Sequence, residues 1–345
     1  MSIIAVPLSL TPLTSASAAG PDCFPLTDRW RPTVLDIQRA VASDINNRGQ
    51  ISGTVLTLYG GPDRPFIWHE GQVTDLETPT GDGGKAAAID DDGRVTGDIW
   101  APPGGGLFNA ALWPAGPGLQ DLGTLGGSSA FPRSIDAGHV VGTIAGDRDQ
   151  AFHWKDGTLT RLPATGDSKA VAVNRYGVIA GTQNLRKGSS SPRERREHAF
   201  VYANGTVTDL GTLREGLWSE ARAINDRGQV VGRAPLEAHG IAWDGFVWSP
   251  ETGMKIIDGG AGVAAPEDLN NNGMLVGSYA CTNVYGDYGP AVWLTPDSAP
   301  VRLPVPDGFT SSNAVAVNDG GVIVGIAAKY NEDYSARVII WQPVR

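Results

Sequence analysis

The residues of this chain that could support acid–base chemistry are few, and they lie in segments that differ from one another. His239 lies in such a segment, and Tyr285 and Glu332 lie in comparable segments further along the chain. A lyase needs a base such as Tyr or His beside a charge-neutralising Arg, for which Arg222 is the candidate, whereas a hydrolase needs two carboxylates. The catalytic candidates are therefore His239, Arg222, Tyr285 and Glu332, and the sequence does not show whether they meet.

Metal-binding and phosphate-binding motifs are missing from the sequence. The five histidines form no HxH and no HExxH pair, and no GxSxG occurs. The glycine-rich stretch from Gly81 to Lys85 has the wrong spacing for a phosphate loop. We expect no metal centre and no cofactor.

Several long segments of irregular sequence hold many aromatic residues. Aromatic faces beside Asn and Asp suit the apolar face and hydroxyls of a sugar, and they suit a protein partner equally well. The alternative is that these rings fold back and cover the ends of the strands. The candidates are Trp100, Trp218, Trp243, Tyr285 and Tyr330.

Charged residues recur two and four positions before a repeated apolar residue. Because side chains alternate along a strand, these positions share one face, and we expect them to surround the mouth of a channel. They either bridge one another as ion pairs or bind an anionic ligand such as a uronic acid or another carboxylate. The residues concerned are Lys85, Arg133, Lys169, Arg222, Glu220 and Glu267.

The elements that position these residues follow from a repeated motif, apolar–Asn/Asp–x–x–Gly–x–apolar–x–Gly. The first copy runs from Ile45 to Gly53, and six further copies follow, of which the one starting at Ile135 is shortened. Successive copies are 39 to 51 residues apart, measured between their first glycines. Asn or Asp followed by Gly is a turn signal, so we interpret the repeated polar residues as structural. They are Asn46, Asp90, Asn174, Asn225, Asn270 and Asn318.

Each copy is followed by an apolar strand that ends in an aromatic residue, which we expect to pack between repeats. A unit of about 45 residues with four strands is typical of a β-propeller blade. Seven units predict an all-β, seven-bladed β-propeller of four-stranded antiparallel blades. The aromatic residues are Trp68, Trp113, Trp154, Tyr202, Trp248, Trp293 and Trp341.

The two ends of the repeat region suggest how the ring closes. The last repeat stops at Trp341 and lacks its outer strand, while Val34-Leu35-Asp36-Ile37 precedes the first repeat without a blade of its own. We expect this N-terminal strand to complete the last blade and close the ring, which removes an unpaired edge.

The repeats also resemble a known family. Ala151-Phe152-His153-Trp154, His198-Ala199-Phe200 and the Asp-Leu-Gly-Thr-Leu strings at 121–125 and 209–213 are similar to the bacterial HAF family of extracellular repeats. The resemblance covers about residues 34–341. It implies a secreted, propeller-like protein and no particular activity.

The net charge and the N-terminal segment limit the kinds of binding partner that we expect. The formal net charge of −10 opposes binding to nucleic acid. Residues 1–19 combine an apolar stretch with a small-residue cleavage pattern and no charge, which predicts a signal peptide and a mature domain from 20 to 345. No later run is long and apolar enough for a membrane span. We expect a secreted monomer.

The two cysteines, Cys23 and Cys281, are compatible with export. Because Cys23 leads into the strand that completes the seventh blade and Cys281 follows the sixth motif, we expect a disulfide bond between them. The alternative is two free thiols.

These observations favour a recognition module that binds a glycan or an extracellular protein on the face with the long irregular loops. A polysaccharide lyase or glycoside hydrolase acting on an acidic sugar is the alternative.

Overall fold

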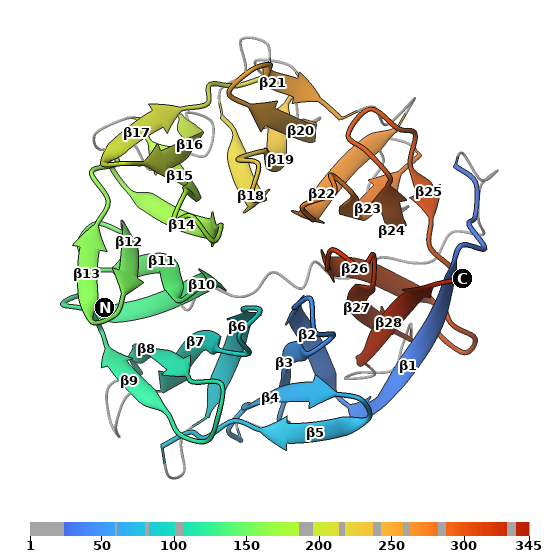
Figure 1. Cartoon of the computed structure of the whole chain (residues 1–345), viewed down its shortest axis with the longest axis horizontal. Helices are drawn as coiled ribbons and strands as arrows, with labels where there is room; N and C mark the ends of the chain where they lie inside the picture. The colour runs from blue at the N-terminus through green and yellow to red at the C-terminus, as the bar shows by residue number, and fades with distance from the viewer. Residues whose placement is uncertain are drawn as a thin grey trace.

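The chain forms a ring of seven antiparallel sheets around a central axis, as a computed structural model shows (Figure 1). The structure describes residues 24–58, 61–79, 83–100, 106–185, 196–213, 218–236, 243–257, 262–281, 288–329 and 336–344. Within them lie twenty-eight β-strands and no helix. The all-β, seven-bladed prediction is confirmed.

Each blade has four strands, which we call a, b, c and d from the axis outward. Blade 1 holds β2 (Ala40–Ile45), β3 (Ile51–Val55), β4 (Arg64–His69) and β5 (Gln72–Asp75). Blade 2 holds β6 (Gly84–Ile89), β7 (Val95–Trp100), β8 (Phe108–Trp113) and β9 (Gln120–Gly123). Blade 3 holds β10 (Ser129–Asp136), β11 (His139–Ala145), β12 (Gln150–Lys155) and β13 (Thr158–Arg161). Blade 4 holds β14 (Ser168–Val173), β15 (Ile179–Asn184), β16 (Glu197–Ala203) and β17 (Thr206–Asp209).

The remaining blades have the same strand order. Blade 5 holds β18 (Glu220–Ile224), β19 (Val230–Pro235), β20 (Trp243–Ser249) and β21 (Gly253–Ile256). Blade 6 holds β22 (Val263–Leu269), β23 (Leu275–Ala280), β24 (Tyr288–Trp293) and β25 (Val301–Arg302). Blade 7 holds β26 (Ser311–Val317), β27 (Ile323–Ala328), β28 (Arg337–Pro343) and β1 (Trp30–Gln38).

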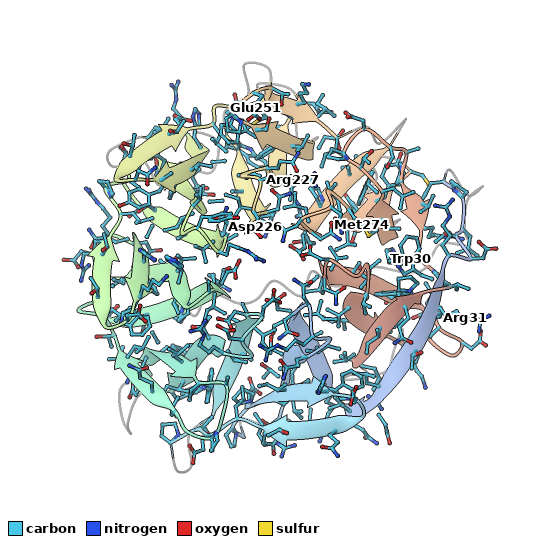
Figure 2. All side chains as sticks on the ribbon, in the orientation of Figure 1. Trp30, Arg31, Asp226, Arg227, Glu251 and Met274 are labelled. Carbon is cyan, nitrogen blue, oxygen red and sulfur yellow. The ribbon has the colours of Figure 1, made fainter. Side chains whose placement is uncertain are left out.

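The N-terminal strand closes the ring as the sequence predicts. β1 pairs antiparallel with β28, in a register that places Val34 opposite Ile339. The strand starts earlier than expected because Trp30 is buried between blades 6 and 7, where its indole nitrogen donates to the carbonyl of Gly321 (2.9 Å). Figure 2 shows Trp30 turned inward and Arg31 turned outward. Strand alternation thus makes Trp30 an anchor for the closing strand.

The segment just before β1 ties the N-terminal chain to blade 6 as well. Leu26 forms a parallel bridge with Arg302 of β25, and the amide of Thr27 donates to the Arg302 carbonyl (2.9 Å). Phe24 packs edge-on against Tyr279, with 4.8 Å between the ring centroids. The N-terminal segment therefore contacts blade 6 as well as completing blade 7.

The a–b turns have the geometry that their Asn-x-x-Gly sequence predicts. In the first copy the side-chain oxygen of Asn46 accepts hydrogen bonds from the amides of Arg48 and Gln50, both at 3.0 Å. Gly49 has a φ of 75°, a left-handed conformation that glycine adopts without steric cost. The repeated Asn and Asp residues are structural, as predicted.

The second glycine of each motif is required by a bulge. In every blade the a–b register shifts at the same place, leaving one extra residue on strand a. The displaced carbonyl of that strand takes the space beside the glycine of strand b, so a Cβ at Gly97 would collide with the carbonyl of Lys85. In four blades a buried Phe on strand c lies opposite this glycine and covers it: Phe66, Phe152, Phe200 and Phe246. This is the phenylalanine of the His-Ala-Phe pattern.

The aromatic residues that end the c strands pack between blades, as expected. Trp113, Trp293 and Trp341 are fully buried, and Trp154 nearly so. The indole nitrogens of Trp113 and Trp341 donate to the carbonyls of Glu77 (2.6 Å) and Pro304 (2.8 Å), in the link that leads into their own blade. Trp68, Tyr202 and Trp248 are partly buried against the same kind of cluster.

Candidate functional site

The ring has two faces with different connections. One, which we call the motif face, carries the seven a–b turns at 46–49, 90–93, 136–138, 174–177, 225–228, 270–273 and 318–321, together with the c–d turns. The other, which we call the loop face, carries the links from b to c and from d to the next a strand.

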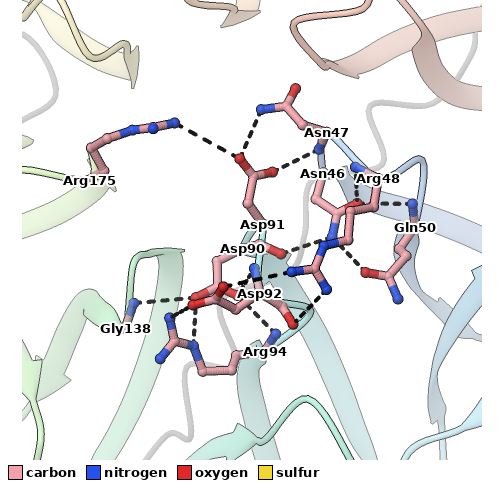
Figure 3. Close-up of polar contacts among 10 residues, drawn as sticks. All are labelled: Asn46, Asn47, Arg48, Gln50, Asp90, Asp91, Asp92, Arg94, Gly138 and Arg175. Carbon is pink, nitrogen blue, oxygen red and sulfur yellow. Dashed lines mark hydrogen bonds and ion pairs between the residues drawn. The ribbon is translucent and has the colours of Figure 1, made fainter.

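On the motif face the repeated Asn side chains also bond from blade to blade. The amide of Asn174 donates to the carbonyl of Asn225 (3.0 Å), and this pattern continues through Asn270 and Asn318 to Asn46 and on to the carbonyl of Asp90. Asp90 has no side-chain donor, so its carboxylate instead accepts from the amide of Gly138 in blade 3 (3.3 Å). Figure 3 shows this change of partner.

The next residue of each motif forms a second series of bonds between blades. The amide of Asn47 donates to Asp91 (2.8 Å), and equivalent bonds link Asp226 to Asn271, Asn271 to Asp319 and Asp319 to Asn47. The shortened turn of blade 3 has Ala137 at this position and cannot take part. Arg175 of blade 4 spans that gap with an ion pair to Asp91 of blade 2 (3.9 Å) (Figure 3). It also pairs with Asp226 of blade 5 (2.7 Å). The polar side chains of the motif face are thus largely occupied in holding blades together.

Each a strand has its bulge two residues before the apolar residue that leads into the a–b turn, and three of the predicted charged residues occupy it. Arg133, Arg222 and Glu267 are the extra residues of β10, β18 and β22. Lys85, Lys169 and Glu220 lie two residues before the bulge residue of their own strands, β6, β14 and β18. A bulge redirects a side chain, and at this position Arg133 is exposed while Arg222 and Glu267 are half-buried.

On the side of blades 5 and 6 these charges compensate one another. Arg222 pairs with Glu220 (3.7 Å), and Arg233 of β19 contacts Glu267 of β22. Burial lowers the pKa of Arg233, an effect that the charge of Glu267 opposes. Arg233 is not among the predicted residues, although it lies directly opposite Glu220 in the a–b register. Mutual ion pairing is the correct description of this half of the mouth.

On the side of blades 2 to 4 the positive charges are only partly balanced by nearby carboxylates. Lys85 lies 3.9 Å from Asp63. Arg133 and Lys169 are exposed, and within the described residues neither has a carboxylate within 4.0 Å. Asp98 lies opposite Lys85 on β7, and burial raises its pKa to about 6 against the opposing charges of Lys85 and Arg133. Asp98 was not among the residues expected at the site, because its position opposite Lys85 is evident only from the pairing of β6 with β7.

An aromatic cluster adjoins this cationic side. Trp100 ends β7 with 45% of its surface exposed, and its ring lies 5.1 Å from that of Phe108, measured between centroids. Phe108 in turn lies 5.4 Å from Phe131 of blade 3, two residues before Arg133. Trp100 is thus the end of a strand and not part of an irregular loop, and Phe131 was not singled out by its sequence.

The other predicted site residues do not join this cluster within the described structure. Trp218 lies just before β18 and is half-buried. Trp243 begins β20, and its side chain lies outside the described residues, as do His239, Tyr285, Tyr330 and Glu332. The described part of the chain contains no group of three or more His, Cys, Asp or Glu residues arranged to hold a metal ion. It also contains no helix with the length and apolar character needed to cross a membrane.

The described histidines belong to the framework of the blades. His198 on β16 bonds across to Asp209 of β17 (2.9 Å). On the motif face of blade 3, the rings of His139 and His153 stack with their nearest nitrogens 2.8 Å apart, and Lys155 lies 2.6 Å from His139. Burial and the Lys155 charge lower the pKa of His139 to about 4, so it is neutral at neutral pH. His153 and His198 are cross-strand contacts, as their place in the repeat suggests.

Comparison with known proteins supports the architecture alone. No protein-family model matches the chain, and no curated protein is similar to it in sequence, so the resemblance to HAF repeats stays a prediction. Among solved structures, the β-propeller domain of the Trilobed protease from Pyrococcus furiosus is 11% identical over 88% of this chain and 95% of that one, with a TM-score of 0.60. That domain has an open velcro topology, whereas β1 closes the ring here.

Two further structures have the same fold. Virginiamycin B lyase from Staphylococcus aureus is 13% identical over 91% of this chain and 99% of its own, with a TM-score of 0.60. The acylaminoacyl peptidase of Pyrococcus horikoshii is 12% identical over 88% of this chain and 51% of its own, with a TM-score of 0.52. The chain is therefore a seven-bladed β-propeller, and because these proteins differ in activity the similarity indicates no particular chemistry.

Proposed function

We propose that this propeller is a secreted recognition module that binds a glycan or an extracellular protein through its loop face. The observation that carries the proposal is the charge distribution at the channel mouth. Arg133 and Lys169 are exposed cations without an ion-pair partner among the described residues, and the half-exposed Trp100 lies on the same side of the ring. The motif face also carries an exposed aromatic residue and an exposed cation, Tyr176 and Arg227, but bonds between blades occupy most of its repeated Asn side chains.

Aromatic side chains and arginine are the residues that contribute most at binding surfaces, whereas ion-paired charges contribute little. A rigid ring that displays them on strand ends and loops is a common arrangement for recognition. An anionic group on the ligand matches the uncompensated side of the mouth.

The test is binding of the purified protein to a panel of neutral and uronate polysaccharides and to extracellular protein extracts. Binding without turnover, weakened by loss of Arg133 or Trp100, supports a recognition module. Binding that depends on the motif face, through Tyr176 or Arg227, would contradict the choice of face.

An enzyme acting on an acidic sugar remains the second candidate, and Asp98 is the observation that favours it. Its raised pKa lies near neutrality and Arg133 acts on it electrostatically, which is the pairing that a proton-abstracting base and a charge-neutralising group require. Incubation with uronate polysaccharides, followed by absorbance of unsaturated products and by reducing ends, tests both lyase and hydrolase activity. Turnover that Asp98→Asn abolishes would establish the enzyme, and none across the panel would exclude it for these substrates.

Export and the disulfide bond form the remaining part of the proposal. The segment 1–19 and Cys23 lie outside the described residues, while no described cysteine is free. Phe24, the residue after Cys23, contacts Tyr279, two residues before Cys281, which supports a bond that fastens the N-terminal segment to blade 6. N-terminal sequencing and intact-mass measurement of the exported protein test cleavage and pairing, and two free thiols would refute the bond.

A further inference from the structure

We infer that the loop face holds a subsite for a carboxylate-bearing sugar ring between blades 2 and 3, where the indole of Trp100 contacts the ring and Arg133 binds its carboxylate. This inference rests on the proposed recognition function and names its ligand class and position.

The platform is held in place before any ligand arrives. Trp100 and Phe108 are cross-strand partners on β7 and β8, and Phe131 of blade 3 supports Phe108 from the other side. The amide of Phe108 donates to the hydroxyl of Ser129 at the start of β10 (3.0 Å), which fixes the two blades against each other at this point. A stacking surface that needs no ordering on binding loses little conformational entropy.

The cation lies on the neighbouring strand at a position that the fold redirects. Arg133 is the bulge residue of β10, two residues beyond Phe131, and is exposed. No carboxylate lies within 4.0 Å of it among the described residues. Its guanidinium can therefore form a bidentate bond with a ligand carboxylate without first breaking an ion pair.

Asp98 sets the pH response of this subsite. It lies two residues before Trp100 on β7, and the charged groups that act on it are Lys85 on β6, Arg133 on β10 and Asp63 before β4. When ionised, its carboxylate competes with an anionic ligand for these cations. Because burial raises its pKa to about 6, the competition weakens as the pH falls below that value.

The surrounding surface favours a sugar over a protein partner. The large apolar residues exposed at the b–c links of the described structure are Trp100 and Leu107 in blade 2, Leu185 in blade 4 and Tyr288 in blade 6. They are spread over three blades and do not form the contiguous apolar centre of a protein interface. One aromatic platform beside one cation fits the flat apolar face and single carboxylate of a uronate unit.

The experiment measures binding of oligogalacturonate and of a neutral galactan oligomer by calorimetry, using the full chain. We expect Trp100→Ala to weaken oligogalacturonate binding by roughly tenfold to a hundredfold, as loss of a stacking contact worth a few kcal/mol implies. Arg133→Gln should weaken oligogalacturonate by about tenfold or more and leave the galactan unchanged, while Arg133→Lys should retain part of the affinity. Asp98→Asn should tighten oligogalacturonate binding at neutral pH and remove its dependence on pH.

Matched controls lie on the opposite face. Tyr176, which is 70% exposed at the fourth position of its motif, and Arg227, an exposed cation labelled in Figure 2, provide the control variants Tyr176→Ala and Arg227→Gln. Neither should change the affinity, and circular dichroism and thermal unfolding of every variant should match the parent protein.

The outcomes separate this inference from the proposed function. If the parent protein binds oligogalacturonate and the Trp100 and Arg133 variants bind it equally well, the subsite is wrong. The proposed loop-face function then stands only if variants at other loop-face residues bind oligogalacturonate more weakly. If the parent protein binds no polysaccharide but captures an extracellular protein through Trp100 and Arg133, the ligand class is wrong and the recognition function stands. If it binds neither, both are overturned.

Discussion

The two faces of this propeller are built from the same seven repeats, yet they use their polar residues in opposite ways. On the motif face each Asn side chain satisfies its own turn and then bonds to the next blade, so that the face is a nearly continuous network. At the bulge of strand a, by contrast, the extra residue varies between blades, from Ser43 and Ala87 to Arg133 and Glu267. Repetition thus produces stability at the turns and variety at the bulges.

The bulge connects these two roles. Its displaced carbonyl needs the motif's second glycine on strand b, and its extra residue on strand a differs in type between blades. A framework position that recurs in every repeat and a position that varies between repeats are therefore products of the same backbone irregularity.

The largest effect should come from filling the space beside the bulge. Gly97→Ala places a methyl group against the carbonyl of Lys85, which the sheet can accommodate only by breaking the bulge. We expect a loss of about 3 kcal/mol or more in the free energy of unfolding, measured in urea, because backbone cannot yield as a side chain does. Gly116→Ala, at an exposed glycine with open space around it, is the control and should leave stability unchanged.

The network of the motif face should show the next largest effect. Asn225→Ala removes the side-chain oxygen that accepts two hydrogen bonds in the turn and the donor to the carbonyl of Asn270, and should cost about 2 kcal/mol. Asn225→Asp keeps the turn, as Asp90 does naturally, and should cost only about 1 kcal/mol. Equal losses for the two variants would show that the bond between blades contributes nothing.

Buried carboxylates near the axis make stability depend on pH. Asp44 accepts the amides of Ile45 and Ile89, yet burial raises its pKa to about 8, and burial likewise raises that of Asp268 to about 7. A raised pKa in the folded state means that this contribution to stability is full below the unfolded value near 4 and is lost as the pH rises to about 8. The free energy of unfolding, measured by denaturant titration, should therefore fall from pH 5 to pH 8 by at least about 1.4 kcal/mol, the equivalent of one pKa unit. Asp44→Asn should reduce this decline, and an unchanged slope would mean that Asp44 is not its source.

The bridge across blade 3 should have a smaller effect. Arg175→Gln removes the ion pairs to Asp226 and Asp91, which are partly exposed, and should cost less than about 1 kcal/mol. The loss should shrink further in high salt, because screening weakens exposed pairs. A salt-independent loss would indicate that packing of the arginine matters more than its charge.

Removing the aromatic platform of the loop face should scarcely affect stability. Trp100→Ala exposes little that is now covered, because nearly half of the side chain is already in solvent, and should change the free energy of unfolding by about 0.5 kcal/mol. Thermal unfolding measures it. A loss as large as that of Asn225→Ala would place Trp100 in the framework and remove the contrast between the faces.

Pattern reasoning from the sequence succeeded where a residue's role is local or repeated. Asn46 and Gly49 form the predicted turn, and the Val34–Ile37 strand completes blade 7 as its composition and position suggest. It failed where the role depends on a neighbour that is distant along the chain. Arg175 reaches Asp91 because the turn of blade 3 is short, Arg233 faces Glu220 across a register, and Phe24 packs on blade 6. None of these contacts has a spacing that a linear pattern detects.

The sequence by itself determined the number of blades, the turns that join strands a and b, the closure by the N-terminal strand and the residues that cannot be functional because they recur in every copy. The tertiary structure alone decided which charges at the channel mouth are paired. Arg222 and Arg133 occupy the same position in their repeats, yet one lies beside a glutamate and the other lies beside an aromatic cluster with no carboxylate within ion-pair distance among the described residues. The physical reason is that hydrogen bonding and chain direction are set within a repeat, whereas electrostatic pairing is set between blades, by residues that the ring brings together from its whole length.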